Sequence, residues 1–163
     1  MILIADASAL IALSACNSLS ILDALFGTVL VPEAVHLEVT TEDKPYAEPL
    51  RRYLLGKVRQ IDMQNFVFLD AYADAGETAA MLLYKQLNAD YLLIDDKRGR
   101  KVAAINQIKT IGSLGVLLQA KRVGLVASIA PLLAQIEASP VFVSRNLLEN
   151  VLELAGESGS LRD

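Results

Sequence analysis

Short apolar runs alternate along the chain with stretches whose apolar residues recur at helical spacing. Residues 2–5 form the first run, and a helical pattern with Ser8 as its candidate N-cap follows to about residue 16. Similar runs predict further strands at residues 28–31, 58–61, 91–94 and 108–111. Helical spacing predicts further helices at residues 19–26, from Pro32 onward, at 50–55, at 78–87, from about 97 to 107, and at 114–122, 128–137 and 144–154, the last two with serine caps. Uniformly apolar strands alternating with helices predict a three-layer α/β/α sandwich with a central, mainly parallel sheet.

The length and composition predict one packed domain. A chain of 163 residues with 53% hydrophobic and 21% charged residues carries enough apolar side chain for a single core. We expect this domain to span residues 1–155 and the tail, residues 156–163, to fray. No apolar run reaches the roughly 18 residues that cross a bilayer. The N-terminus has no basic segment and carries Asp6 within its apolar stretch, so we expect a cytoplasmic protein without a membrane segment.

Rare residue types exclude several chemistries. Cys16 is the only cysteine and His36 the only histidine, which excludes an internal disulfide and a thiolate or histidine-rich metal site. No glycine-rich nucleotide-binding motif occurs. The net charge of −4 argues against a surface that binds nucleic acid throughout, unless several acids gather at a metal and leave the basic residues free to form a track.

Polar side chains follow three of the predicted strands. Asp6 follows the first, Asp95 and Asp96 follow the strand at 91–94, and Ser113 follows the next. Because the carboxyl ends of parallel strands meet at one edge, where ligands bind in such sheets, we expect these groups at that edge. Adjacent carboxylates repel unless a cation joins them. This positive charge would come either from the basic residues at 97–101 or from a Mg²⁺ or Mn²⁺ ion, which prefers oxygen ligands.

Two further acids are open to ordinary explanations when each is taken alone. Glu38 lies more than one turn inside a predicted helix, where a solvated face accounts for it. Glu77 lies at a predicted helix N-terminus, where the helix dipole accounts for it.

Taken together in this order, the acids and their neighbours give the chain a resemblance to the PIN-domain superfamily of metal-dependent nucleases, whose small members include the VapC-type toxins of toxin–antitoxin pairs. The resemblance covers roughly residues 1–155 and includes a double Asp and a Gly-Ser-Leu-Gly motif. The segments that carry it are IADASALIAL, VPEAVHLEV, AGETAAMLL, ADYLLIDDKRGRKVA and TIGSLGVLLQAKRVGLV.

The resemblance implies a site and a cofactor, Mg²⁺ or Mn²⁺. The implied metal acids are Asp6, Glu38, Glu77, Asp95 and Asp96, all but Asp95 also being implied as catalytic. Ser8 and Ser113 would orient a ligand or a metal-bound water. Glu77 stands where most PIN proteins have Asp, and Ala79 stands where this subgroup would have a second acid.

The implied activity is hydrolysis of RNA phosphodiester bonds by an endoribonuclease, as the toxin of a VapBC-type module restrained by a small antitoxin. Apolar helices such as 144–154 are compatible with a homodimer. Substrate phosphates would be received by Lys97, Arg98, Arg100 and Lys101, although a solvated helix face explains these residues equally well.

Two other functions stay open. One is a PIN-like module that binds RNA or a protein without cutting. The other is a receiver-like phospho-signalling domain, which fits less well because its acidic pair closes the first strand and a lysine ends the last. Here the pair comes late, and Gly112 and Ser113 follow the last strand.

Overall fold

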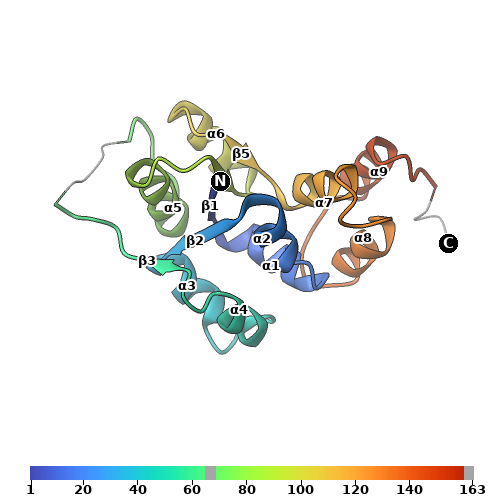
Figure 1. The fold of residues 1–163 in the computed structure, drawn as a ribbon, viewed down its shortest axis with the longest axis horizontal. Helices are drawn as coiled ribbons and strands as arrows, with labels where there is room; N and C mark the ends of the chain where they lie inside the picture. Colours follow the sequence, from blue (N-terminus) through green and yellow to red (C-terminus); the bar gives the residue numbers. More distant parts are fainter. Residues whose placement is uncertain (65–68, 160–163) are drawn as a thin grey trace.

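Five parallel strands form the centre of the protein in the computed structural model, which describes residues 1–64 and 69–159 (Figure 1). The strands run in the order β3-β2-β1-β4-β5. Their bounds are β1 Ile2–Ala5, β2 Thr28–Pro32, β3 Val58–Arg59, β4 Tyr91–Leu93 and β5 Thr110–Ile111. The chain builds outward from β1 to β3 on one side and then crosses to β4 and β5 on the other. The strand order therefore reverses between β1 and β4, which is where open parallel sheets bind ligands.

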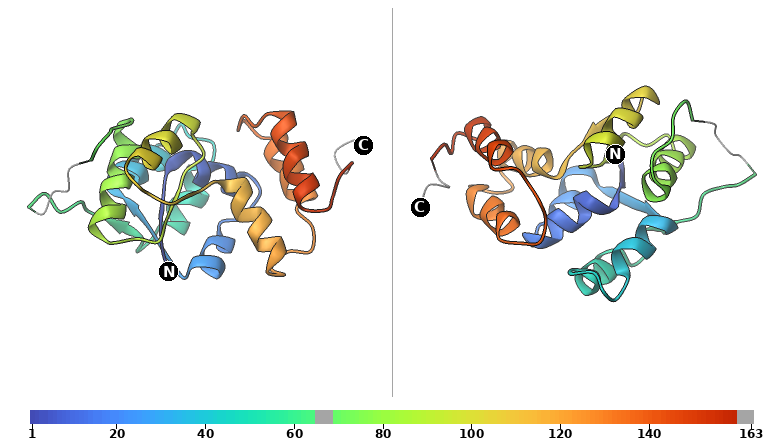
Figure 2. Two further views of the ribbon diagram at one scale, coloured as in Figure 1. Left: turned by 90° about the horizontal axis from the view of Figure 1, so that it is seen from above. Right: turned by 180° about the vertical axis from the view of Figure 1, so that it is seen from behind.

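Helices cover both faces of the sheet. Their bounds are α1 Ala7–Ala15, α2 Ser20–Phe26, α3 Glu33–Thr40, α4 Ala47–Tyr53, α5 Ala75–Gln86, α6 Lys97–Ile105, α7 Ser113–Arg122, α8 Ala130–Glu137 and α9 Arg145–Leu154. Successive strand residues point to opposite faces, so Ile4 packs with α5 and α6 while Leu3 and Ala5 pack with the other helices. Figure 2 shows α8 and α9 side by side beyond α7. The predicted three-layer α/β/α sandwich is confirmed.

The predicted element ends differ from the observed ones at two serines. Helix α1 begins at Ala7 with Asp6 as its N-cap residue, so Ser8, predicted as the cap, lies inside the first turn. Ser128 does not cap α8, whose N-cap residue is Ile129, because its hydroxyl bonds to Glu157 instead. Ser144 does cap α9, since its Oγ accepts a hydrogen bond from the Leu147 amide at 3.2 Å. Sequence position predicts a cap at each of the three serines, but it does not reveal a competing partner such as Glu157 for Ser128.

No single helix of the described residues is long and apolar enough to cross a bilayer. Among these residues, α1 and α2 have the length and composition only as a pair, and they are bent by 116° relative to each other.

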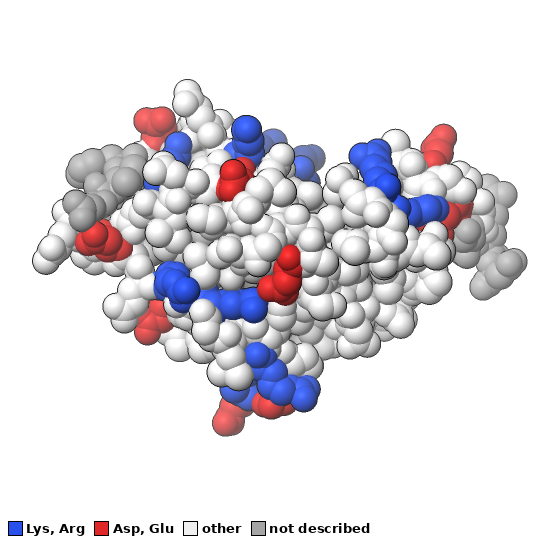
Figure 3. Space-filling view, in the orientation of Figure 1, with Lys and Arg blue, Asp and Glu red and all other residues white. Residues whose placement is uncertain are grey.

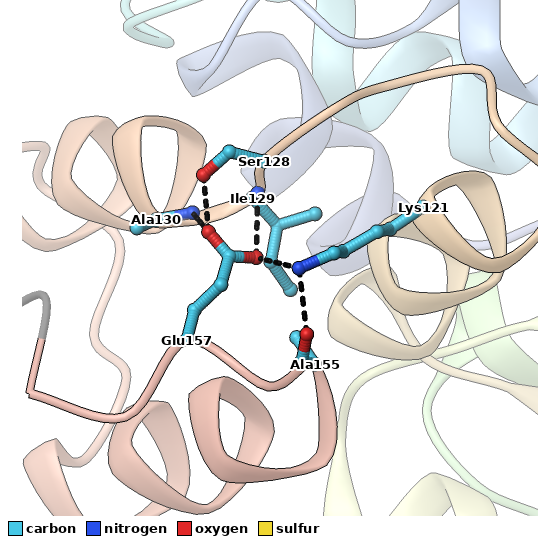
Figure 4. Close-up of polar contacts among 6 residues, drawn as sticks. All are labelled: Lys121, Ser128, Ile129, Ala130, Ala155 and Glu157. Atoms are coloured by element: carbon cyan, nitrogen blue, oxygen red, sulfur yellow. Dashed lines mark hydrogen bonds and ion pairs between the residues drawn. The ribbon is translucent and has the colours of Figure 1, made fainter.

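A carboxylate from the C-terminal segment fastens the last helices together (Figure 4). Glu157 Oε2 accepts hydrogen bonds from Lys121 Nζ at 2.9 Å and from the Ile129 amide at 3.0 Å. Its Oε1 accepts from the Ala130 amide at 3.2 Å and from the Ser128 hydroxyl. Burial raises the pKa of Glu157, but these hydrogen bonds outweigh it and bring the pKa to about 2. Glu157 falls within the predicted tail, and the predicted domain boundary at residue 155 stays a prediction.

Glu157→Gln should lower the free energy of unfolding by about 1–3 kcal/mol, because hydrogen bonds to a charged acceptor are lost. The lowered pKa also sets a pH window: this contribution is present above the ordinary pKa of 4.5 and disappears as the pH falls towards 2. Urea unfolding at pH 7 and pH 3 measures both effects. Glu153→Gln, at an exposed position on α9, is the control, and equal stability of the two variants at pH 7 would contradict the role of Glu157.

Candidate active site

Two acids of the site, Asp6 and Asp96, follow β1 and β4, the strands between which the strand order reverses. The Asp6 amide donates a hydrogen bond to the Leu93 carbonyl at 2.8 Å, so the residues that follow β1 and β4 are held side by side. Asp6 is only 3% exposed. Asp96 is the N-cap residue of α6, and its Oδ2 accepts from the Gly99 amide at 2.7 Å. Asp6 and Asp96 therefore follow neighbouring strands at the same edge of the sheet, and their joint role at a metal stays a prediction.

Helix α5 contributes two more acids from its N-terminus. Asp74 is its N-cap residue, and its Oδ1 accepts from the Glu77 amide at 2.8 Å. Asp74, Glu77, Asp96, Arg98 and Ala73 line a cavity of about 410 Å³, called the acid pocket below. Sequence reasoning missed Asp74, although an acid three residues before Glu77 at a helix start was a visible capping signal.

Glu38 approaches the same helix from α3. Its Oε2 lies 2.9 Å from the point where a Cβ on Gly76 would stand, so the Glu38 side chain rests against the first turn of α5. Glu38 is exposed, and its charge acts on Asp6. Glu38, Asp74 and Glu77 thus all lie within electrostatic range of Asp6.

Burial and crowding make two of these carboxyl groups hard to ionise. The pKa of Asp6 is raised from 3.8 to about 7, first by burial and then by the negative charges of Glu77, Asp74 and Glu38, against a hydrogen bond from the Ala7 amide. The pKa of Glu77, which is 6% exposed, is raised from 4.5 to about 7 by burial and then by the charges of Asp74 and Asp96. Such raised values are typical of sites built to hold a proton or a cation.

The two adjacent aspartates point into different cavities. Asp95 accepts hydrogen bonds at 2.6 Å from both the amide and the hydroxyl of Ser113, and so fastens the start of α7 to the end of β4. Asp95, Ser113 and Ser8 line a second cavity of about 700 Å³, called the groove below, whose other wall is apolar and includes the exposed Phe142. Within the described residues the buried Ser8 Oγ has no hydrogen-bond partner. The metal role of Asp95 and the orienting roles of the serines stay predictions.

The basic residues of α6 divide between the two cavities. Arg98 lines the acid pocket, Lys97 and Arg100 line the groove, and Lys101 is exposed on the same helix. Figure 3 shows Lys and Arg side chains gathered over α6. In the part of the chain that the structure describes, none of these four is in an ion pair with a carboxylate. They are therefore available to an anion, although their predicted role in binding substrate stays a prediction.

The donor chemistry of the acid pocket fits a hard dication. Asp74 and Asp96 repel the Glu77 carboxylate within this pocket, and such repulsion among oxygen ligands is the condition that a divalent cation relieves. Within residues 1–64 and 69–159, however, no three acidic, histidine or cysteine side chains are close enough to hold one ion together. Coordination by three of them would require their side chains to converge.

Gly99→Ala should destabilise the protein, because α6 passes too close to the acid pocket for a side chain at this position. An added Cβ would stand 2.8 Å from Glu77 Cδ and 2.6 Å from Ile94 Cδ1. We expect a loss of about 1–3 kcal/mol of stability from overpacking, which exceeds the helix-propensity gain of alanine over glycine. Urea unfolding checks it, with Gly115→Ala in α7, where the nearest atom lies at 3.2 Å, as the milder control. A stabilised Gly99→Ala variant would contradict this packing.

Comparison with known proteins identifies the family of the chain. A family model described as a PIN domain matches residues 2–157. No curated protein and no solved structure gave a significant match to the chain. Because the family match covers nearly the whole chain, the chain belongs to the PIN-domain family.

Proposed function

We propose that this protein is a metal-dependent endoribonuclease that hydrolyses RNA phosphodiester bonds. PIN domains are typically nucleases and generally use divalent metals. The observation that carries the proposal is the burial of Asp6 and Glu77 among further carboxylates, at the point where the strand order reverses. Buried acids that raise one another's pKa destabilise a fold, so their presence at this edge is best explained by a cation that binds there.

The residues that would hold Mg²⁺ or Mn²⁺ are Asp6, Glu38, Glu77 and Asp96, with Asp74 beside them. When bound, such an ion lowers the pKa of a water molecule and stabilises the negative charge that develops at phosphorus. Within the chain, pKa values raised to about 7 allow Asp6 and Glu77 to hold protons near neutral pH when no cation is bound. Arg98 lies at the same pocket, where its guanidinium can bind a substrate phosphate in bidentate fashion.

Cleavage of a labelled single-stranded RNA in the presence of Mn²⁺ tests this proposal. We expect cleavage by the purified protein, loss of cleavage with a chelator, and recovery when Mn²⁺ is restored in excess. Binding of the RNA without cleavage under all these conditions would favour the alternative of a PIN-like binding module.

The α6 side chains should contribute more to RNA binding than to chemistry. Replacing Arg98 and Arg100 together by glutamine should raise KM for RNA by roughly tenfold and flatten its salt dependence, since each lost phosphate contact lowers the salt slope by about one. Initial rates at several salt concentrations measure this effect. Arg52→Gln on α4, an exposed arginine remote from the acid pocket, is the control. Equal KM values for the double variant and for Arg52→Gln would contradict the proposed role of Arg98 and Arg100 in binding substrate phosphates.

The finer proposal is that the enzyme is the toxin of a VapBC-type toxin–antitoxin module. The groove supports it, because an apolar hollow beside the acid pocket, with Phe142 91% exposed at its wall, is suited to an apolar segment of a small antitoxin. A homodimer and a cytoplasmic location are part of the same proposal. A short reading frame directly upstream whose product, when co-expressed, relieves growth inhibition would support it, whereas growth unaffected by this protein alone would count against it.

The receiver-like alternative is disfavoured by topology. Receiver domains have the strand order 2-1-3-4-5, whereas the order here is 3-2-1-4-5. The match to a PIN-domain model agrees with this distinction.

A further inference from the structure

We infer that Asn106 is a positioning residue that fixes the shape of the acid pocket by joining the loop before Asp74 to the helix that starts after Asp96. The structural part of this inference stands on the contacts of Asn106 alone. Its consequence for metal and RNA rests on the proposed function.

Asn106 is an amide at the C-cap of α6 that is 3% exposed and fully engaged. Its Oδ1 accepts a hydrogen bond from the Asp70 amide at 2.7 Å. Its Nδ2 donates to the Ala71 carbonyl at 2.9 Å and to the Val102 carbonyl at 3.0 Å. The same nitrogen lies 3.8 Å from Met81 Sδ on α5. One side chain therefore contacts α6, α5 and the loop at once.

These contacts join the two elements whose ends supply acids to the pocket. Helix α6 begins directly after Asp96 and ends directly before Asn106, so the position of Asn106 relative to Asp96 is set by one short, rigid helix. At its other side Asn106 holds Asp70 and Ala71, which precede Asp74 by four and three residues. The separation of Asp74 and Asp96 across the pocket thus depends on the Asn106 amide.

A second attachment completes the path from Asn106 to Asp74. The Thr78 hydroxyl accepts from the Ala73 amide at 3.1 Å and donates to the Ala73 carbonyl at 3.2 Å. Asp74 itself caps α5. Between Ala71 and Ala73 only Tyr72 intervenes, so the loop has little freedom to move while Asn106 holds its first residues.

The polar side chain at position 106 favours a role in positioning its neighbours over a role in filling space between α5 and α6. A buried amide destabilises a protein unless each of its groups is paired, and an aliphatic side chain of similar size would pack between α5 and α6 without that requirement. Hydrogen bonds with fixed directions set a geometry that apolar contacts do not, because buried polar networks specify a unique arrangement.

The test compares two variants of Asn106 with packing controls in the full-length protein. Asn106→Ala removes all the side-chain contacts. Asn106→Asp keeps an acceptor for the Asp70 amide and the volume of the side chain, but an ionised carboxylate no longer donates to the Ala71 carbonyl. Ile136→Val and Leu133→Ala, both in the buried face of α8 and remote from the acid pocket, provide mild and strong losses of stability for comparison.

Three readouts are taken at a temperature where every variant is folded: Mn²⁺ affinity from the electron paramagnetic resonance of the free ion, kcat and KM for RNA, and the crystal structure of Asn106→Ala. We expect Asn106→Ala to weaken Mn²⁺ binding by about tenfold or more and to lower kcat with little change in KM, as losses of residues that orient metal ligands do. We expect its Asp74 and Asp96 carboxylates to move apart by about 1 Å or more, a displacement large enough to impair catalysis. The α8 controls should match the wild type in Mn²⁺ affinity and in kcat and KM.

The structural readout separates the failure of this inference from the failure of the proposed function. If Asp74 and Asp96 keep their positions in Asn106→Ala, or if its Mn²⁺ affinity and kcat equal those of the α8 controls in an active wild type, the inference is overturned. If the wild type neither binds Mn²⁺ nor cleaves RNA, the proposed function fails, and the crystal structure alone then decides whether Asn106 positions the pocket. Should Asn106→Ala not fold, Asn106→Asp is subject to the same criteria.

Discussion

Asp6→Asn is expected to abolish RNA cleavage while leaving the protein folded. The substitution keeps the shape of a side chain that is 3% exposed and removes the carboxyl group that would bind the metal ion in its ionised form. We expect the cleavage rate to fall by roughly 100-fold or more, comparable to the loss of one charge-stabilising group from an active site. Initial rates on a labelled RNA with saturating Mn²⁺ measure it.

The matched control is Asp90→Asn, since Asp90 also lies next to a strand of the sheet but at its opposite end, where its Oδ2 accepts from the Ile2 amide at 2.7 Å. Cleavage by this variant should resemble that of the wild type at equal folded concentration. An Asp6→Asn protein as active as the wild type would remove Asp6 from the mechanism and, with it, the reason for assigning the pocket to catalysis.

The metal-free protein should lose stability as the pH rises from about 4 to about 7. In this range the unfolded chain has released the Asp6 proton, because its ordinary pKa is 3.8, while the folded protein still holds the proton. The unfolded state therefore binds fewer protons, and the free energy of unfolding falls with rising pH. For Asp6 alone the fall is at most about 4 kcal/mol, and Glu77 acts in the same direction.

Urea unfolding of chelator-treated protein at half-unit pH intervals measures this trend. Asp6→Asn should be more stable than the wild type at pH 7.5 and should show a shallower decline, because the asparagine does not ionise. Glu42→Gln, at an exposed turn position, should follow the wild-type curve. Parallel curves for the wild type and Asp6→Asn would show that Asp6 ionises freely in the fold.

The fold was largely predictable because its signals are local. Uniformly apolar runs such as residues 2–5 and 91–94 occur where a strand is covered on both faces, and the observed β1 and β4 fall within them. Parallel strands share one carboxyl edge, and this rule predicts that Asp6 and Asp96, which follow β1 and β4, lie at the same edge of the sheet. The predicted strand at 108–111 proved shorter, since the Ile108 amide bonds to the Ala103 carbonyl and closes α6 instead.

The remainder of the site depends on partners distant in the sequence. Whether Asp95 or Asp96 faces the acid pocket is decided by Ser113, 18 residues away, which takes Asp95 as its partner. Asp74 lines the acid pocket because of the position of the loop at 69–74. Asn106 holds this loop by its hydrogen bonds to Asp70 and Ala71. Spacing along the chain records neither contact.

The binding of Mn²⁺ to the metal-free protein, followed by calorimetry at pH 7 in buffers of different ionisation enthalpy, tests the central claim most directly. If the buried acids form a cation site, Mn²⁺ binds, protons are released from Asp6 and Glu77, and Asp6→Asn lowers both the affinity, by roughly tenfold or more, and the number of protons released. Absence of binding at millimolar Mn²⁺, or binding that Asp6→Asn leaves unchanged, would contradict the account.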